Sequence, residues 1–300
     1  EDAETAFIEG LGRPPDRRFL DAYSQSTATF ISLGSAMTGR YPSAVPMCGF
    51  LPGAYIAPGF QPGAGQDPGR GGGAPATGGV DHTWCAGIPA DRHTLPELLG
   101  LYGYRTAAFH DQGPPMSTLF DGKFTATYPV EVEPRTRSTR WTGLEDHVTR
   151  WMAGDATEPR FSMIVLSDLT RESVARQMVV RGVPGLDGAA RAPAERANPH
   201  APAWRQDYLE QAREVGAEVG KLIAALEGVP GRPRWWFVTS ADGISLGEMT
   251  GSGGGWPGMG RLRNLCTELL VDRTVHVPLL VLGPGGGEPV EIAGPVELVD

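Results

Sequence analysis

The sequence predicts an α/β fold with a mostly parallel sheet covered by helices on both faces. Short apolar runs typical of buried strands alternate along the chain with segments of helical periodicity. The predicted strands are the runs at 104–109, 160–169, 234–243 and 275–285. The 300 residues are 40% hydrophobic and 20% charged, which suits one large domain with a sizeable core. We therefore expect a single domain over residues 1–300.

Composition also excludes some function classes. The net charge of −9 argues against a nucleic-acid-binding surface, because neutralising phosphates requires clustered cations. No run of eighteen apolar residues occurs, so we expect no transmembrane segment in this chain. No signal peptide is visible at the first residues.

The segment 22–44 is the most informative stretch of the sequence. It reads as the end of a strand, a turn, and a short helix that begins near Thr29 and stops at Gly39. This arrangement places a hydroxyl at a helix N-terminus, where unpaired backbone N–H groups and the helix dipole attract anions. Thr29 could equally be an N-cap whose hydroxyl satisfies a backbone N–H of the first turn.

This segment resembles the nucleophile segment of the sulfatases, within the alkaline phosphatase superfamily. There a Cys, Ser or Thr stands nine residues before Thr-Gly-Arg or Thr-Gly-Lys, and here Thr29 stands nine residues before Thr38-Gly39-Arg40. The resemblance implies an alkaline-phosphatase-like three-layer sandwich. It also implies that Thr29 is the nucleophile or its vestige.

A long Gly/Pro-rich loop covers residues 45–90 and shows neither helical nor strand periodicity. Cys48 and Cys85 bracket this loop, so a disulfide that closes it fits an oxidising compartment. Buried thiols at Cys48, Cys85 and Cys266 are the equally weighted alternative.

Three helices follow from periodicity and end signals. Thr94 can cap the first, which Gly103 ends. The second begins with a capping box at 142–145, and the third covers 208–228 with an apolar stripe. The stripe residues are Ala212, Val215, Val219, Leu222 and Leu226.

The remaining elements resemble the same family in the family's order. The helix and strand at 93–109, the helix at 208–228 and the strand at 275–285 are all similar to sulfatase segments. Residues 295–300 resemble the start of the helix that follows the family's last large strand. The family begins with an apolar strand that bears a metal-binding Asp pair, and no such strand precedes residue 22. We therefore expect a truncated member of the family.

The loop that binds the cation in the family reads TSDHGE there, and here it begins Thr239-Ser240-Ala241-Asp242-Gly243. The metal-binding Asp is replaced by Ala241, which has no ligand atom, and the His by Asp242. One carboxylate does not make a divalent site, so no cofactor is expected. Asp242 and Asp168 remain weak metal candidates, and one divalent cation (Ca, Mn or Zn) is the alternative.

Other chemical positions of the family have also changed. The family's Asp-Pro-His appears here as Asp168-Leu169-Thr170, and a His-Gly pair is replaced by Arg261-Leu262. The family's second Ser is kept as Ser32, but Leu33 stands where a basic residue follows it. Arg40 and Arg261 are the candidate anion-binding residues.

These changes predict a catalytically degenerate sulfatase-like domain that acts as a binding or structural module. We expect it outside the cytoplasm, with a protein partner and within a larger, membrane-associated assembly. The alternative is an active metal-dependent hydrolase of sulfate or phosphate esters with Thr29 as nucleophile. A third interpretation is a non-catalytic anion sensor at Thr29. The substrate, the partner and the oligomeric state do not follow from the sequence.

Overall fold

The structure is a computed structural model of the 300-residue chain. It describes residues 2–26, 29–42, 44, 48–51, 82–85, 87–89, 91–111, 119–133, 139–154, 157–169, 174, 177–178, 180–183, 201–231, 233–243, 275–284 and 286–299.

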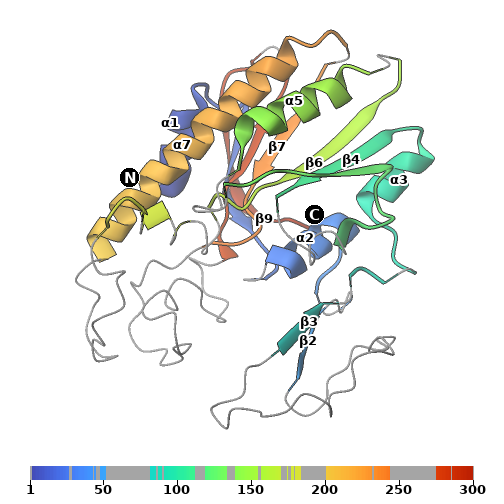
Figure 1. Cartoon of the computed structure of the whole chain (residues 1–300), viewed down its shortest axis with the longest axis horizontal. Helices are drawn as coiled ribbons and strands as arrows, with labels where there is room; N and C mark the ends of the chain where they lie inside the picture. The colour runs from blue at the N-terminus through green and yellow to red at the C-terminus, as the bar shows by residue number, and fades with distance from the viewer. Residues whose placement is uncertain are drawn as a thin grey trace.

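Two sheets make the centre of the fold (Figure 1). The first has the strand order β5-β4-β6, with β5 at Ala126–Pro129, β4 at Arg105–His110 and β6 at Arg160–Val165. All of its strands are parallel. The second has the order β7-β8-β1-β9. Its strands are β7 (Trp236–Thr239), β8 (Leu279–Leu282), β1 (Arg17–Tyr23) and β9 (Val290–Glu297).

Helices pack on both faces of the parallel sheet, as the sequence predicts. On one face, α5 (Trp141–Met152) and α7 (Ala201–Glu227) bury Leu144, Val148 and Leu222 against Phe109 of β4. On the other face, α2 (Thr29–Thr38) buries Phe30 and Met37 against β4 and β6. The successive side chains Ala108 and Phe109 point to opposite faces, so β4 joins both cores.

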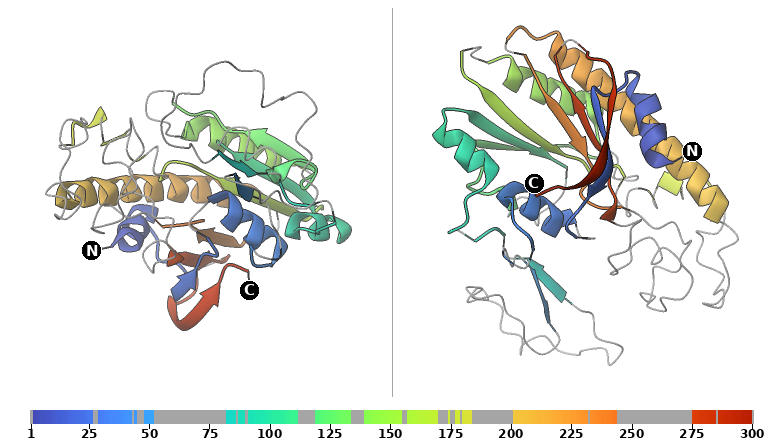
Figure 2. Two further views of the ribbon diagram at one scale, coloured as in Figure 1. Left: turned by 90° about the horizontal axis from the view of Figure 1, so that it is seen from below. Right: turned by 180° about the vertical axis from the view of Figure 1, so that it is seen from behind.

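A close helix crossing covers one face of the second sheet. Helix α1 (Ala3–Leu11) lies along α7 (Figure 2). At the crossing, Gly10, Gly216 and Gly220 face the backbone of the other helix, and a Cβ on any of them would overlap a carbonyl group. Leu11, Ile223 and Leu282 form the core between these helices and the sheet. The opposite face of this sheet leaves Phe237 71% exposed.

Strand β1 depends entirely on the C-terminal part of the sequence for its partners. It pairs with β8 in antiparallel and with β9 in parallel orientation. Because β8 is also antiparallel to β7, the sheet is less uniformly parallel than the sequence predicts. The predicted helix start at 295–300 is wrong. Residues up to Glu297 belong to β9, and Leu298 N–H continues the pairing by donating to the Tyr23 carbonyl.

The three predicted helices at 94–103, 142–152 and 208–228 are present, but their ends differ from the prediction. Helix α3 (Leu95–Leu101) follows Thr94 as predicted, and Gly103 has the positive φ that ends such helices. The capping box at 142–145 is wrong, because α5 begins at Trp141 with Arg140 as its N-cap. Helix α7 begins seven residues earlier than predicted. Helix α1 was not predicted; its N-cap Asp2 accepts a hydrogen bond from Thr5 N at 2.8 Å.

The Gly/Pro-rich loop contains two short strands that the sequence does not predict. Strands β2 (Cys48–Leu51) and β3 (His82–Cys85) pair with each other in antiparallel orientation. They project beyond α2 in Figure 1. The residues between them lie outside the described part of the chain. No helix among the described residues is long and apolar enough to cross a membrane.

Candidate functional site

The N-terminus of α2 is the first component of the site. Thr29 is its first residue, as the sequence predicts. Strand β1 ends at Tyr23, only a few residues earlier, so the turn presents the N-terminus of α2 near a strand end of the second sheet. The backbone N–H groups of a first turn have no partner inside the helix, and the helix dipole makes this end attractive to a negative charge.

That negative charge is provided by the protein itself. The Thr29 hydroxyl donates to Asp242 Oδ2 at 3.2 Å, and the Thr29 backbone N–H donates to the same carboxylate. Asp242 follows β7, whose last residue is Thr239. The carboxylate of Asp242 therefore occupies the anion-binding position at the start of α2. We call Thr29 and Asp242 the Thr29 site.

A buried hydroxyl network fixes the loop that carries Asp242. Ser24 Oγ contacts the carbonyl of Ala241, and it lies 2.8 Å from Ser32 Oγ. Ser32 in turn donates to the carbonyl of Ser26 at 2.8 Å. Both serine side chains are buried. Ser32, retained from the family pattern, therefore holds the turn and the loop together rather than facing the Thr29 hydroxyl.

Burial sets the protonation behaviour of the Thr29 site. It raises the pKa of Asp242 to about 6, although the two hydrogen bonds from Thr29 act in the opposite direction. Burial also raises the pKa of Tyr208, to about 12, with a further contribution from the charge of Asp242. Tyr208 lies on α7 and stays protonated at neutral pH. No cation contributes to the pKa of Asp242 among the described residues.

Asp168 lies in a different cluster. Its Oδ1 accepts a hydrogen bond from Thr139 N at 3.0 Å, and its Oδ2 contacts the Thr139 hydroxyl. That hydroxyl also lies 3.0 Å from Asp111 Oδ2, which follows β4. We call Asp111 and Asp168 the carboxylate pair. Asp168 shares no hydrogen bond with Asp242 in the described structure, so the two weak metal candidates are not brought together.

The described residues do not fit the divalent cation that the fold implies. Ala241 offers no ligand atom at the loop position, and Asp242 Oδ2 is already bonded to the Thr29 hydroxyl. Within the described ranges, no group of three or more His, Cys, Asp or Glu side chains could hold a metal ion. We therefore derive no chemical step through a metal.

Of the two candidate arginines, the structure describes only Arg40, which is not next to Thr29. Arg40 is exposed and follows the C-terminal end of α2. A ten-residue helix is about 15 Å long, so Arg40 lies at the opposite end from the Thr29 hydroxyl. Arg261 lies outside the described residues. Both remain predictions as anion-binding groups.

The register of β2 and β3 places Cys48 directly opposite Cys85. Opposed residues in an antiparallel ladder have Cα atoms about 4.5–5.5 Å apart, which lies within the range of disulfides. The disulfide remains a prediction. Thiol titration of the denatured, unreduced protein would give one free thiol if the bond exists and three if it does not.

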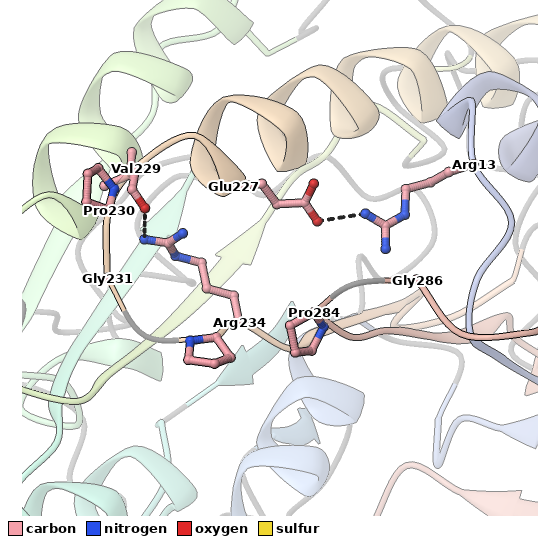
Figure 3. Close-up of a pocket in the computed structure, with 9 residues that line it drawn as sticks. Arg13, Glu227, Val229, Pro230, Gly231, Arg234, Pro284 and Gly286 are labelled. Carbon is pink, nitrogen blue, oxygen red and sulfur yellow. Dashed lines mark hydrogen bonds and ion pairs between the residues drawn. The ribbon is translucent and has the colours of Figure 1, made fainter.

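A large cavity among the described residues lies far from the Thr29 site along β7 (Figure 3). It measures about 600 Å³ and lies beside Arg234, before β7 begins, whereas Asp242 follows the end of β7. Its arginines are engaged. Arg13 pairs with Glu227 at 2.7 Å, and Arg234 donates to the Val229 carbonyl at 2.9 Å. Because both arginines already have partners, the cavity offers no free cation among the described residues to hold an anion.

Sequence reasoning missed the residues that complete both clusters. Ser24 and Thr139 carry no motif, and Tyr208 was read only as the first residue of a helix; each meets its partner only through the fold. Asp111 follows the carboxyl end of the parallel strand β4. That position is the one signal that could have pointed to the carboxylate pair.

No protein-family model and no curated protein sequence matches this chain. Solved structures do. A putative sulfatase from Bacteroides thetaiotaomicron matches with a TM-score of 0.58 and 13% identity, over 96% of this chain and 61% of that one. The phosphonate monoester hydrolase of Agrobacterium radiobacter matches with a TM-score of 0.56 and 14% identity, over 99% and 67%.

A third match is the C-terminal periplasmic domain of EcEptC from Escherichia coli, in a complex with Zn. Its TM-score is 0.55 at 12% identity, over 94% of this chain and 66% of that domain. The chain thus spans about two thirds of the length of these structures. These matches show that the chain has a sulfatase-like fold.

Proposed function

We propose that this chain is a sulfatase-like domain that binds a partner and no longer hydrolyses esters. The observation that supports the proposal most is the bonding of Asp242 to both the hydroxyl and the N–H of Thr29. An ester's anionic group would need this position at the start of α2. An internal carboxylate that already fills it competes with any such substrate and repels its charge.

An anion-binding comparison tests this competition directly. Asp242→Ala removes the internal charge and leaves the donors of α2 in place. We expect inorganic phosphate and sulfate to raise the melting temperature of this variant and not that of the wild type. Asp146→Ala on the exposed face of α5 is the matched control. Equal anion stabilisation of wild type and Asp242→Ala would contradict the proposal.

Ester turnover and metal content test the loss of catalysis. We expect the wild type to hydrolyse p-nitrophenyl sulfate, p-nitrophenyl phosphate and phenyl phosphonates no faster than Thr29→Ala. We also expect elemental analysis of protein purified without chelator to find no stoichiometric divalent ion. Turnover that Thr29→Ala abolishes would refute the binding-only function.

The second candidate function is a hydrolase of sulfate or phosphate esters. It is favoured by the 3.2 Å contact between Thr29 Oγ1 and Asp242 Oδ2, which is the geometry of a nucleophile and its general base. A base with a pKa of about 6 is ionised at neutral pH. This function predicts a kcat/KM that rises with pH through about 6 and is lost in both Thr29→Ala and Asp242→Asn.

The partner that we propose is another protein, met outside the cytoplasm and within a larger, membrane-associated assembly. The periplasmic origin of one structural neighbour supports the location. We also infer that the helices on the two faces of the sheet complete a three-layer sandwich.

An exposed apolar surface over α3 supports a protein partner. Leu101 and Tyr102 are 79% and 81% exposed, and neighbouring large side chains are also exposed. The members of this α3 surface are Leu95, Leu98, Leu101, Tyr102 and Tyr104. Such clusters are typical of interaction sites.

We expect Leu101→Lys with Tyr102→Lys to change the stability of the isolated domain by less than about 0.5 kcal/mol and to weaken the partner complex. A large loss of stability would show that the surface is covered within the domain.

A further inference from the structure

The carboxylate pair has features that the proposed function does not use. Asp111 and Asp168 are only 6% and 4% exposed. They follow β4 and β6, which are neighbouring parallel strands, so they meet at one edge of the sheet. Thr139, just before α5, contacts both of them. The cluster therefore ties two strand ends to the segment that leads into a helix.

No cation balances these two carboxylates. In the part of the chain that the structure describes, neither forms an ion pair with Lys, Arg or His. Two described basic side chains of the adjoining segments contact other groups. Arg140 pairs with Glu131 at 3.0 Å and is exposed, and the His110 ring packs on Phe120 at 5.3 Å. Two buried negative charges without a counterion would be costly.

Counting hydrogens shows how the cluster avoids this cost. Asp111 Oδ2 contacts Ser167 N, Ser167 Oγ and the Thr139 hydroxyl. Asp168 contacts Thr139 N and the same hydroxyl. The Thr139 hydroxyl thus contacts one oxygen of each acid but supplies a single hydrogen. If both carboxylates were ionised, one contact of the Thr139 hydroxyl would set oxygen lone pairs against each other.

We infer that the carboxylate pair holds one proton at neutral pH, shared through Thr139. This proton completes the hydrogen-bond network that links β4, β6 and the residues before α5. The proton lies on Asp168 Oδ2, which donates to Thr139 Oγ1, and the Thr139 hydroxyl donates to Asp111 Oδ2. Asp111 is the ionised member because it already accepts two hydrogen bonds from Ser167.

Burial supports this assignment independently of the hydrogen count. It raises the pKa of Asp111 and of Asp168, and the charge of Asp111 raises the pKa of Asp168 further. Asp111 Oδ1 is buried without a hydrogen-bond partner. A cation bound there would be the competing explanation, but this oxygen is the only carboxylate atom of the pair that no protein donor contacts among the described residues. A single ligand atom does not make a metal site.

The test compares the pH dependence of unfolding in wild type and Asp168→Asn. In the unfolded chain both groups ionise near pH 4, so the folded wild type binds one proton more. Its unfolding constant should rise tenfold per pH unit above about pH 5, until the pair loses its proton. An amide side chain at position 168 cannot ionise, so the contribution of the pair should disappear in the variant, which should keep only the pH dependence that Asp242 contributes. Asp146→Asn is the matched exposed control and should keep the wild-type dependence.

Infrared spectroscopy gives a second, direct readout. The wild type at pH 7 should show a carboxylic acid C=O band that Asp168→Asn and Asp111→Asn both lack. If Asp168→Asn does not fold, Asp111→Asn and the wild-type band still decide the outcome. Identical pH dependence in wild type and both Asn variants, with no acid band, would overturn the inference. Stabilisation of wild type but not Asp168→Asn by Ca²⁺, Mg²⁺ or Zn²⁺ would overturn it in favour of a cation.

Discussion

The Thr29 site and the carboxylate pair hold buried aspartates in contrasting ways. Each has a threonine hydroxyl in contact with a carboxylate that follows a strand. At the Thr29 site a single carboxylate also receives an N–H at the start of a ten-residue helix. The carboxylate pair lies near the start of α5 but receives no hydrogen bond from the first turn of that helix in the described structure, and one threonine hydroxyl must serve two acids.

This difference determines whether the acid in contact with the threonine hydroxyl is ionised or protonated. At the Thr29 site, hydrogen bonds from Thr29 act against the effect of burial, and with a pKa of about 6 Asp242 is ionised at neutral pH. In the carboxylate pair a single hydroxyl serves two buried acids, so we expect one of them to be neutral.

Replacing each threonine by valine should separate the two cases most clearly. Thr139→Val leaves two buried acids without their bridge, and we expect it to lower the free energy of unfolding by about 3–4 kcal/mol. Thr29→Val leaves the backbone N–H bonded to Asp242, and we expect a loss of about 1–2 kcal/mol. Urea unfolding at pH 7 measures both. Equal losses would remove the proposed contrast.

The pH dependence of Asp242 should be the next largest effect. Its folded pKa of about 6 lies above the unfolded value of about 3.9. The stability that it contributes is therefore complete below about pH 4 and is lost as the pH rises through about 6, by about 2–3 kcal/mol. Asp242→Asn should remove this loss and be more stable than wild type at pH 7.

Unfolding of Asp242→Asn and wild type at pH 4.5 and pH 7 measures this effect. The two proteins should differ more at pH 7 than at pH 4.5. A wild type that gains stability relative to Asp242→Asn as the pH rises would show that the helix N-terminus lowers the pKa of Asp242 more than burial raises it.

The smallest effect concerns the hydroxyls behind the Thr29 site. Ser24→Ala removes a contact to the Ala241 carbonyl and a partner of Ser32, and should cost about 1–2 kcal/mol. Ser35 is a matched control on α2, because its buried hydroxyl has no hydrogen-bond partner among the described residues. Ser35→Ala should be neutral or slightly stabilising. Thermal unfolding at pH 7 compares them, and a larger loss for Ser35→Ala would contradict the network.

The sequence predicted those parts of the fold that local patterns determine. Helix α2 begins at Thr29, and α3 follows Thr94, because capping residues and glycine stops are local signals. Strand β9 was mistaken for a helix start because its strand character comes from pairing with β1, which lies almost 300 residues earlier. Non-local pairing leaves little trace in a short window of sequence.

The candidate site was predictable to a similar extent. The resemblance pointed to Thr29 and Asp242 and implied that Ala241 stands where the family has a metal ligand. It did not indicate that Asp242 would bond to Thr29, because that contact depends on how the loop after β7 is held by Ser24. Asp168 was interpreted as a metal candidate. Its buried partners Asp111 and Thr139 come from separate elements and carry no common motif.

The position of β1 has a consequence for synthesis of the chain. Both ladder partners of β1 lie between Leu279 and Glu297, and α1 rests on α7. At 5–20 residues per second, roughly 15–55 s separate the emergence of β1 from that of β9. Throughout that interval the backbone groups of β1 have no ladder partners, so this segment can associate with other chains. We therefore expect aggregation during synthesis to be most frequent before β8 and β9 emerge.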